Sequence, residues 1–295
     1  MRLLDSLAGT LEAAGFDPAL ADAVAHGREI EALPTERRLA LLSLDFDQIQ
    51  PTILASPRPV TIYGASLKIQ AWDEAMANGK LAALPEAASV LFAGGGNAVL
   101  LVPAEDDAGA MAMAAALEAA LRRETLGSGT TAWRRLSPRE LVRGPPALPD
   151  AQGAAARLGL RSEGRFGAWL GLLSRQLQET KAGDRAHAFL EGLRSGPRCT
   201  ECGLRPQAPD HERCERCEAY RERGGQDRTV SEQARTFEQV LDETRKMAFL
   251  FIDGRGIGGQ LAGLETIADY HAVSRALREA FDVEPLAEEL GLEKK

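Results

Sequence analysis

The sequence is low in aromatic residues, cysteine and positive charge, and each shortage excludes a class of protein. Aromatic residues make up 5% of the chain, so leucine, alanine and valine must fill most of any core. Four cysteines in 295 residues are too few for a disulfide-stapled scaffold. Lys and Arg number 35 against 43 Asp and Glu, which gives a net charge of −8. This balance argues against a protein that coats nucleic acid through its overall charge, but it leaves room for a local basic groove.

The sequence also lacks a long hydrophobic run. The acid at Asp5 comes too early for the apolar core of a signal peptide. The longest uncharged stretch, 87–104, contains a Gly-Gly-Gly-Asn sequence and ends near Pro103, which is typical of two buried strands around a turn rather than of a membrane helix. We therefore expect a cytoplasmic protein with no membrane association.

With 44% apolar residues, the chain has enough material for about two domains of ordinary size. Hydrophobic periodicity and turn residues in the first half predict a strand, a helix, a hairpin and a second helix. Their expected ranges are 39–44, 65–78, 90–93 with 99–102, and 108–125. This order favours an α+β domain with helices on one face of an antiparallel sheet. Residues 127–164, rich in Gly, Pro and Arg, are interpreted as loop and boundary.

The second half of the chain predicts further helices and one more buried strand. The expected helices cover 166–194, 231–244 and 264–281, and the strand covers 248–252 and ends at Asp253. The expected organisation is a helical N-terminal segment, an α+β domain, a helical linker and the start of a second α+β unit. Their boundaries are 1–37, 38–145, 146–228 and 229–295.

Two parts of the sequence resemble each other at a fixed offset of 208 residues. Asp45 and Asp253 each end a predicted strand, and each is followed 21 residues later by a helical serine, Ser66 or Ser274. These coincidences favour a duplicated strand–turn–helix unit. In the first copy the hairpin turn begins 49 residues after Asp45, and the same spacing from Asp253 falls beyond the last residue. We therefore expect the second unit to lack its own hairpin and a protein partner to complete it.

All four cysteines lie in two CxxC pairs, Cys199 with Cys202 and Cys214 with Cys217, separated by eleven residues. Two such knuckles can surround one metal ion tetrahedrally, and four sulfur ligands with no open position describe a structural Zn²⁺ site. His211 lies between the pairs and could replace a ligand, but four cysteines suffice. The arginines around this ribbon (199–217) are nearly cancelled by acids, so they give only modest support for nucleic-acid binding.

Two glycine-rich segments could approach a nucleotide. Gly94, Gly95, Gly96 and Asn97 form the expected hairpin tip, where glycine lets a phosphate or a base come close to the backbone. The tip carries no acid. Asp45 and Asp47 on the neighbouring strand are either part of a weak metal site or a solvated pair of acids.

Residues 254–259 formally match the dinucleotide fingerprint GxGxxG. The preceding strand ends in Asp253 rather than glycine, and only 36 residues follow Gly259, too few for the rest of a Rossmann sheet. An acid followed by flexible backbone at Gly254 suits a contact with a metal–triphosphate, which we prefer. A zinc-ribbon oxidoreductase that uses this segment is the lowest-ranked alternative.

These features, in this order, resemble the large subunit of type III CRISPR effector complexes, the palm-domain polymerase/cyclase family. The resemblance covers roughly residues 38–282. It rests on strand-end Asp45, Gly64-Ala65-Ser66, the glycine hairpin, the paired CxxC ribbon and strand-end Asp253. It implies a ferredoxin-like first palm, a zinc-ribbon insert and the start of a second, incomplete palm. The sequence departs from the family in lacking the Gly-Gly-Asp-Asp hairpin and the N-terminal His-Asp nuclease domain.

The resemblance also implies a function and assigns roles. Cys199, Cys202, Cys214 and Cys217 would bind structural zinc, and Asp253 would hold Mg²⁺ or Mn²⁺ with ATP. Ser66, Ser274, Gly254 and the tip residues 94–97 would contact nucleotide. The implied function is antiviral defence, as one part of a split, ATP-using cyclic-oligonucleotide synthase. The alternative is a catalytically inactive nucleotide- or RNA-binding scaffold subunit of a defence complex that could contain RNA.

Overall fold

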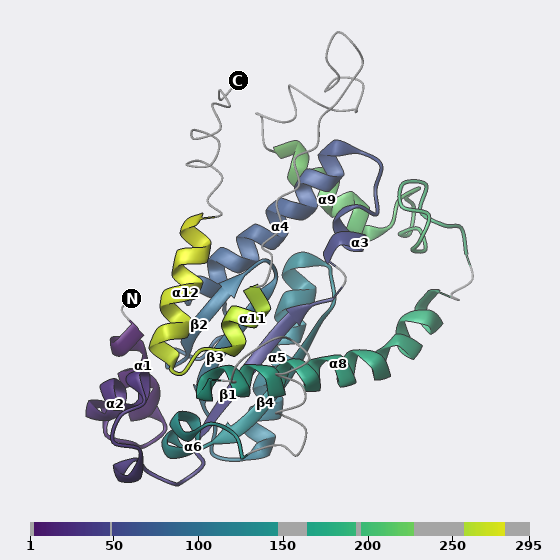
Figure 1. The fold of residues 1–295 in the computed structure, drawn as a ribbon. Helices are drawn as coiled ribbons and strands as arrows, with labels where there is room; N and C mark the ends of the chain where they lie inside the picture. Colours follow the sequence, from purple (N-terminus) through teal and green to yellow (C-terminus); the bar gives the residue numbers. More distant parts are fainter. Residues whose placement is uncertain (1–2, 48, 147–163, 193–195, 227–256, 281–295) are drawn as a thin grey trace.

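The computed structural model describes residues 3–47, 49–146, 164–192, 196–226 and 257–280 (Figure 1). The strands are β1 (Leu39–Phe46), β2 (Ser89–Gly94), β3 (Asn97–Pro103) and β4 (Gly129–Leu136). The helices are α1 (Leu3–Ala13), α2 (Ala21–His26), α3 (Ile49–Ile53), α4 (Pro59–Ala77), α5 (Asp107–Thr125), α6 (Pro138–Arg143), α8 (Arg165–Gly192), α9 (Glu215–Gln226), α11 (Ile257–Ala262) and α12 (Ile267–Ala280). None of the described helices combines the length and apolar character needed to cross a bilayer.

The four strands form one antiparallel sheet in the order β2-β3-β1-β4. The strand at 39–44, the hairpin and the helix at 108–125 are confirmed close to their expected bounds, while α4 begins at Pro59, six residues before its expected start. The register places strand-end Asp45 opposite Asn97 of β3 on one side and opposite Thr130 of β4 on the other. The strand end and the hairpin tip therefore meet at the same edge of the sheet.

The interpretation of 127–164 as loop is wrong for its first part, because β4 and α6 lie there. Strand β4 has the sequence GTTAWRRL, whose threonines and arginines obscure an apolar alternation. Among the described strands it pairs with β1 alone, and its buried residues Thr130, Thr131 and Ala132 owe their burial to tertiary packing. Helix α6 has a capping box, in which Ser137 and Glu140 each accept from the other's backbone N–H.

The two helices predicted within this domain, α4 and α5, lie on one face of the sheet as expected, but further helices cover the other face (Figure 1). On one face, Leu42 and Leu44 of β1 pack with α4 and α5; Ile69, Trp72 and Leu117 belong to this cluster. On α5, Ala110 is buried, whereas the neighbouring Met111 is 60% exposed. A central strand that is buried on both sides is apolar almost throughout, which explains the run LALLSL.

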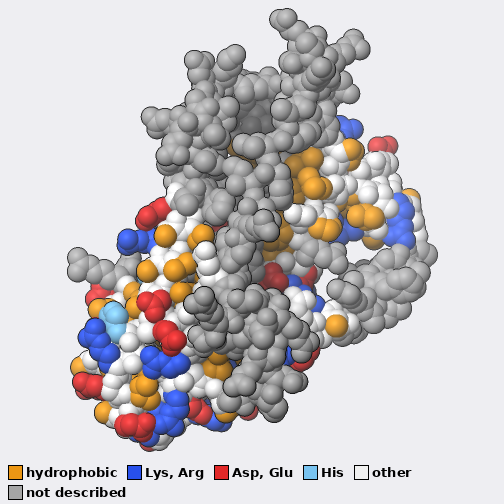
Figure 2. All heavy atoms as spheres, in the orientation of Figure 1, with side chains coloured by type: hydrophobic (Ala, Val, Ile, Leu, Met, Phe, Trp, Pro, Cys, Tyr) orange, Lys and Arg blue, Asp and Glu red, His pale blue; other side chains and the backbone are white. Residues whose placement is uncertain are grey.

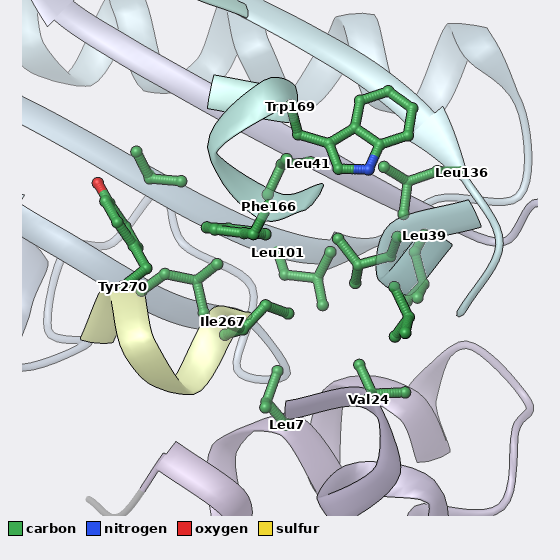
Figure 3. Close-up of a cluster of buried hydrophobic side chains, with 14 of the residues drawn as sticks. Leu7, Val24, Leu39, Leu41, Leu101, Leu136, Phe166, Trp169, Ile267 and Tyr270 are labelled. Atoms are coloured by element: carbon green, nitrogen blue, oxygen red, sulfur yellow. The ribbon is translucent and has the colours of Figure 1, made fainter. Parts of the chain in front are cut away.

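The other face is covered by α1, α2, α8 and α12, which come from distant parts of the sequence. Figure 3 shows these side chains converging over β1, β3 and β4: Leu7, Val24, Leu39, Leu41, Leu101, Leu136, Phe166, Trp169, Ile267 and Tyr270. The rings of Phe166 and Tyr270 lie 5.4 Å apart, centroid to centroid, which ties α8 to α12. On the outer surface, Figure 2 shows charges of both signs interspersed over the helices at the N-terminal end of the chain, in keeping with the modest net charge.

The 208-residue offset reappears in the helix boundaries. Helix α3 begins at Ile49 and α11 at Ile257; α4 begins at Pro59 and α12 at Ile267. The two helix pairs pack differently, however: α4 contacts its own sheet and α9, whereas α12 contacts α2 and β2. The predicted helix at 231–244 and the strand at 248–252 lie outside the described residues.

Helices α4 and α9 cross at two glycines. A Cβ atom on Gly64 would lie 1.8 Å from the backbone oxygen of Tyr220, and one on Gly224 would lie 2.0 Å from that of Val60. Each glycine therefore meets the backbone of the other helix, which cannot move aside as a flexible side chain could. The Tyr220 hydroxyl donates to the Thr125 carbonyl oxygen at 2.7 Å and links α9 to the end of α5 as well.

We predict that Gly64→Ala destabilises the fold by about 1–3 kcal/mol, because the added methyl group forces the two backbones apart. Thermal unfolding followed by circular dichroism measures the effect. The matched control is Gly225→Ala on α9, where an added Cβ meets nothing within 4 Å and the midpoint should be unchanged or slightly higher. Equal midpoints for the two variants would contradict the proposed crossing.

Candidate metal centre and strand-end site

The four cysteines converge on one point, as their spacing predicts. Their sulfur atoms all lie within 4.8 Å of one another. The Sγ atoms of Cys202 and Cys214 are 3.9 Å apart, close to the roughly 3.8 Å edge of a tetrahedron with Zn–S bonds of about 2.3 Å. Three of the four side chains are buried. The donor set and its geometry therefore fit a tetrahedral Zn²⁺ ion with no open position.

Backbone hydrogen bonds shape each half of this cluster. In the first half, the Cys202 N–H points to the Cys199 sulfur at 3.5 Å, and Gly203 follows with φ +65°, a conformation that favours glycine. In the second half, Cys214 immediately precedes α9 and Cys217 lies in its first turn. The metal ligands are thus divided between a tight turn and the start of the helix that crosses α4.

The thiols of the cysteine cluster differ in pKa. Hydrogen bonding from the Cys217 thiol lowers the pKa of Cys214 to about 5. The same hydrogen bond and burial raise the pKa of Cys217, and burial raises that of Cys202. Metal binding must therefore displace protons from at least two thiols, since only thiolates bind zinc.

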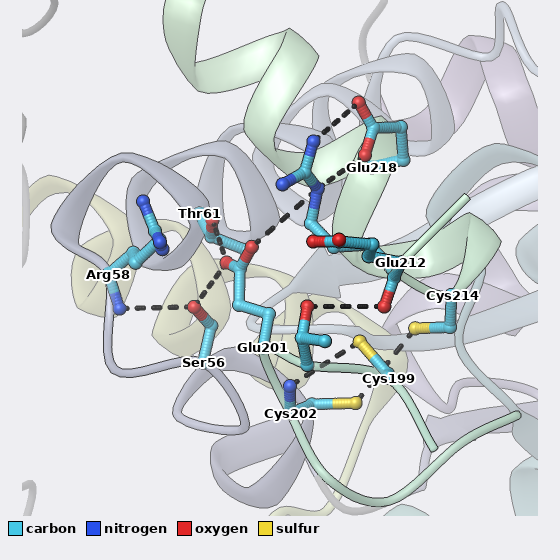
Figure 4. A network of polar contacts seen from close by, with 11 residues as sticks. Ser56, Arg58, Thr61, Cys199, Glu201, Cys202, Glu212, Cys214 and Glu218 are labelled. Carbon is cyan, nitrogen blue, oxygen red and sulfur yellow. Dashed lines mark hydrogen bonds and ion pairs between the residues drawn. The ribbon is translucent and has the colours of Figure 1, made fainter. Parts of the chain in front are cut away.

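Glu201, between the first two cysteines, connects the ribbon to α4 (Figure 4). Its side chain is 2% exposed. One carboxylate oxygen accepts hydrogen bonds from the Ser56 hydroxyl at 2.5 Å and from the Thr61 hydroxyl. The other accepts none from the described residues and lies 4.0 Å from Nε of Arg213. A buried carboxylate with these partners fixes the ribbon against the first turn of α4.

Arg213 completes this junction from the second half of the ribbon. Its Nε donates to Glu218 of α9 at 2.5 Å, and this hydrogen bond holds the pKa of Glu218 below its ordinary value. The guanidinium therefore lies between the carboxylates of Glu201 and Glu218. This arginine is engaged by acids of its own ribbon, as the interleaved charges in the sequence suggest.

The glycine tip of the β2–β3 hairpin is held by α4. Gly95 and Gly96 have φ of +59° and +76°, so both need the left-handed region. The Gly96 N–H donates to both carboxylate oxygens of Asp73 at 3.1 Å, and the Gly96 carbonyl accepts from the Phe46 N–H. The Asn97 amide donates to the Gly95 carbonyl. A phosphate that approached the Gly96 N–H would have to displace a carboxylate.

Asp45 and Asp47 at the end of β1 are paired with a lysine from α8. The Lys181 ammonium lies 2.5 Å from Oδ2 of Asp45 and 2.8 Å from Oδ1 of Asp47. The Thr130 hydroxyl of β4 donates to Asp47 as well. Burial lowers the pKa of Lys181, but hydrogen bonds to the two carboxylates outweigh it and raise this pKa overall. The alternative of a solvated pair of acids is therefore wrong.

The two serines at the 208-residue offset lie in different surroundings. Ser66 is exposed on α4, and its hydroxyl donates to the Ile62 carbonyl one turn earlier. Ser274 on α12 is 6% exposed, next to the core cluster that contains Ile267 and Tyr270. The described structure thus does not give the two serines a common environment. Asp253 and Gly254 lie outside the described residues.

Sequence reasoning did not find Glu201, Asp73 or Lys181. Glu201 could have been noticed from the sequence, because an acid between the two cysteines of a CxxC pair lies close to the expected metal site. No sequence pattern marks Asp73 or Lys181. Their partners, Gly96 and Asp45, lie 23 and 136 positions away in the chain.

No protein-family model and no curated protein matches this sequence. Similar solved structures include an apo Csm1–Csm4 cassette, which matches 50% of this chain with a TM-score of 0.33 and 20% identity. A Csm1–Csm4 cassette in complex with pppApA matches 52% of this chain with a TM-score of 0.31 and 21% identity. Csm1 from T. onnurineus has a TM-score of 0.22 at 22% identity over 43% of this chain. The matches span 19%, 21% and 18% of those chains, respectively, so the likeness is partial.

We expect one zinc ion per chain, measured by inductively coupled plasma mass spectrometry after gel filtration. Cys217→Ser should lower the stoichiometry well below one, whereas His211→Ala, which alters an exposed residue outside the cluster, should leave it at one. A full zinc complement in Cys217→Ser, or its loss in His211→Ala, would contradict the four-cysteine site.

The protein should release zinc as the pH is lowered. Hydrogen bonding from the Cys217 thiol lowers the pKa of Cys214 to about 5, so before metal binds this ligand becomes protonated as the pH falls toward that value. Protonation of the thiols also displaces the metal. A titration with a colorimetric zinc indicator between pH 8 and pH 5 should show increasing release; release that rises toward pH 8 would disprove this.

Glu201→Ala should weaken the junction between the ribbon and α4 by about 1–3 kcal/mol, because Ser56 and Thr61 lose their acceptor. Hydrogen–deuterium exchange should increase in residues 56–66. Glu212→Ala is the matched control, since this exposed ribbon residue makes its described contact through its backbone carbonyl. Equal exchange in both variants would argue against the junction.

Proposed function

We propose that this chain is a nucleotide-binding palm protein of a prokaryotic CRISPR-type antiviral defence system, and that it forms one part of a split, ATP-using cyclic-oligonucleotide synthase. The single observation that carries the proposal is the 208-residue offset shared by the strand-end acids and by the starts of two successive helices in each copy. Two palm-like units with a zinc ribbon between them follow most directly from it.

The architecture of the first unit agrees with this proposal. Its elements run strand–helix–strand–strand–helix–strand, and the sheet order is β2-β3-β1-β4 with every pair antiparallel. This order of elements and strands supports the proposal of a ferredoxin-like first palm, which the resemblance implies. The ribbon that follows packs against α4 through Glu201 and through the crossing of Gly64 with α9.

In the proposed chemistry, Asp253 would hold Mg²⁺ or Mn²⁺ at the end of the second unit's strand. The metal would neutralise the triphosphate of ATP and lower the pKa of the attacking hydroxyl. Gly254 would give the triphosphate access to the backbone, and Ser66, Ser274 and the tip residues 94–97 would contact nucleotide. Because one acid is a weak site for two metals, a protein partner would supply an acidic hairpin.

The α11–α12 pair provides a defined base for such a second unit. The N–H groups of Gly164 and Gly167, before and inside the first turn of α8, donate to the carbonyls of Ala262 and Leu264 at 3.0 and 2.8 Å. The carbonyls at the end of α11 and just after it thus accept hydrogen bonds from amides at the start of α8. Such amides have no hydrogen-bond acceptor within their own helix. A partner that completes the second sheet would bind next to this junction.

A scaffold role is the second candidate, and a specific observation favours it. In the first unit, the Gly96 N–H is bound by Asp73, and the strand-end carboxylates are bound by Lys181. Protein groups therefore occupy two positions where nucleotide or metal would bind in an active palm. The scaffold could belong to an RNA-containing defence complex without consuming ATP.

The deciding experiment is ATP turnover by the full chain, alone and co-expressed with a polypeptide that carries a Gly-Gly-Asp-Asp hairpin. Chromatography with mass spectrometry would identify linear products such as pppApA and cyclic products. We expect turnover only with the partner, and a loss of at least 100-fold in Asp253→Ala. Glu279→Ala, on the exposed side of α12, is the control and should retain activity. Unchanged turnover in Asp253→Ala would remove Asp253 from the site, and no turnover with the partner bound would favour the scaffold.

A further inference from the structure

The ion pair at the end of β1 has the geometry of an occupied cation site. The carboxylates of Asp45 and Asp47 lie two positions apart, and side chains at that spacing project from the same side of a strand. One oxygen of each lies within 2.8 Å of the same point, the Lys181 ammonium. The side chains of Asp45, Asp47 and Lys181 are 27%, 22% and 19% exposed, so solvent screens the cluster only in part.

Two further oxygen-bearing residues lie next to the two carboxylates. Thr130 places a hydroxyl on Asp47, and Asn97 lies opposite Asp45 in the register of β3. Carboxylate, hydroxyl and amide oxygens are the ligands that Mg²⁺ and Mn²⁺ prefer. With Lys181 in place, two acids face one positive charge, so the cluster keeps one negative charge; a divalent ion would neutralise it completely.

The lysine reaches this point because of its place on α8. Leu173, Leu177 and Lys181 are spaced by four residues and lie on one side of the helix. Leu173 and Leu177 are buried in the cluster over β1 and β4. Lys181 continues that apolar stripe, so its stem lies on the sheet while its ammonium meets the carboxylates.

We propose that Lys181 is a tethered cation that occupies the position of a divalent metal ion at the end of β1. The first unit thereby keeps its strand-end acids without binding metal, and α8 is anchored to the sheet by the same contact. The inference concerns the first unit alone and does not depend on Asp253 or on turnover.

The test is Mn²⁺ binding by zinc-loaded full-length chain, followed by electron paramagnetic resonance of free Mn²⁺. All variants carry Asp253→Asn, so the proposed metal ligand of the second unit contributes nothing. Lys181→Met removes the charge and keeps the length of the side chain. We expect it to bind one Mn²⁺ at least tenfold more tightly than the parent chain, and to lose this gain when Asp45→Asn and Asp47→Asn are added.

Two controls isolate the charge. Lys181→Arg keeps the cation and should bind no more Mn²⁺ than the parent, and Lys80→Met, which removes an exposed lysine, should behave the same way. Lys181→Gln removes the charge but retains a donor, and serves as a second test if the methionine variant unfolds. The proposal is overturned if neither Lys181→Met nor Lys181→Gln gains Mn²⁺ binding, or if both unfold and Mn²⁺ does not restore their thermal transition.

Discussion

The packing of α4 between the sheet and α9 is the constraint on which both candidate sites depend. One side of α4 buries Trp72 and Met76 against the strands, and the other meets α9 at Gly64, where no side chain fits. The same helix receives Glu201 of the ribbon near Thr61 and, through Asp73, holds the Gly96 N–H at the hairpin tip. The cysteine cluster and the hairpin tip are therefore both attached to α4.

The two helix pairs that share the 208-residue offset lie in different surroundings. At the same offset, Ser66 is exposed on α4, whereas Ser274 is buried on α12. Helix α12 uses Ile267 and Tyr270 to pack beside β2 and α2 and joins the core cluster that includes α8. Helix α12 thus helps α1, α2 and α8 to cover the face of the sheet opposite α4 and α5.

Local patterns were enough to predict part of this structure. The two CxxC pairs predicted the cysteine cluster because each pair spans three positions and only eleven residues separate the pairs. The glycine tip predicted the hairpin because only glycine adopts its φ values readily. Strand β4 escaped prediction because Thr130 and Thr131 are buried only by the neighbours that fold onto them. Lys181 and Asp73 escaped because long-range packing, rather than spacing, brings each to its partner. The described residues confirm an α+β fold, while the proposed roles of Asp253 and Gly254 still rest on sequence.

The lysine at the end of the α8 stripe has a consequence for how that helix settles on the sheet. Leucines at a regular four-residue spacing would fit the same surface after a slide of four residues, about 6 Å. Such a slide would bring Leu177 to the carboxylates of Asp45 and Asp47 and leave them without a counterion. A single charge among apolar residues therefore specifies one register, as a buried polar residue does in a coiled coil.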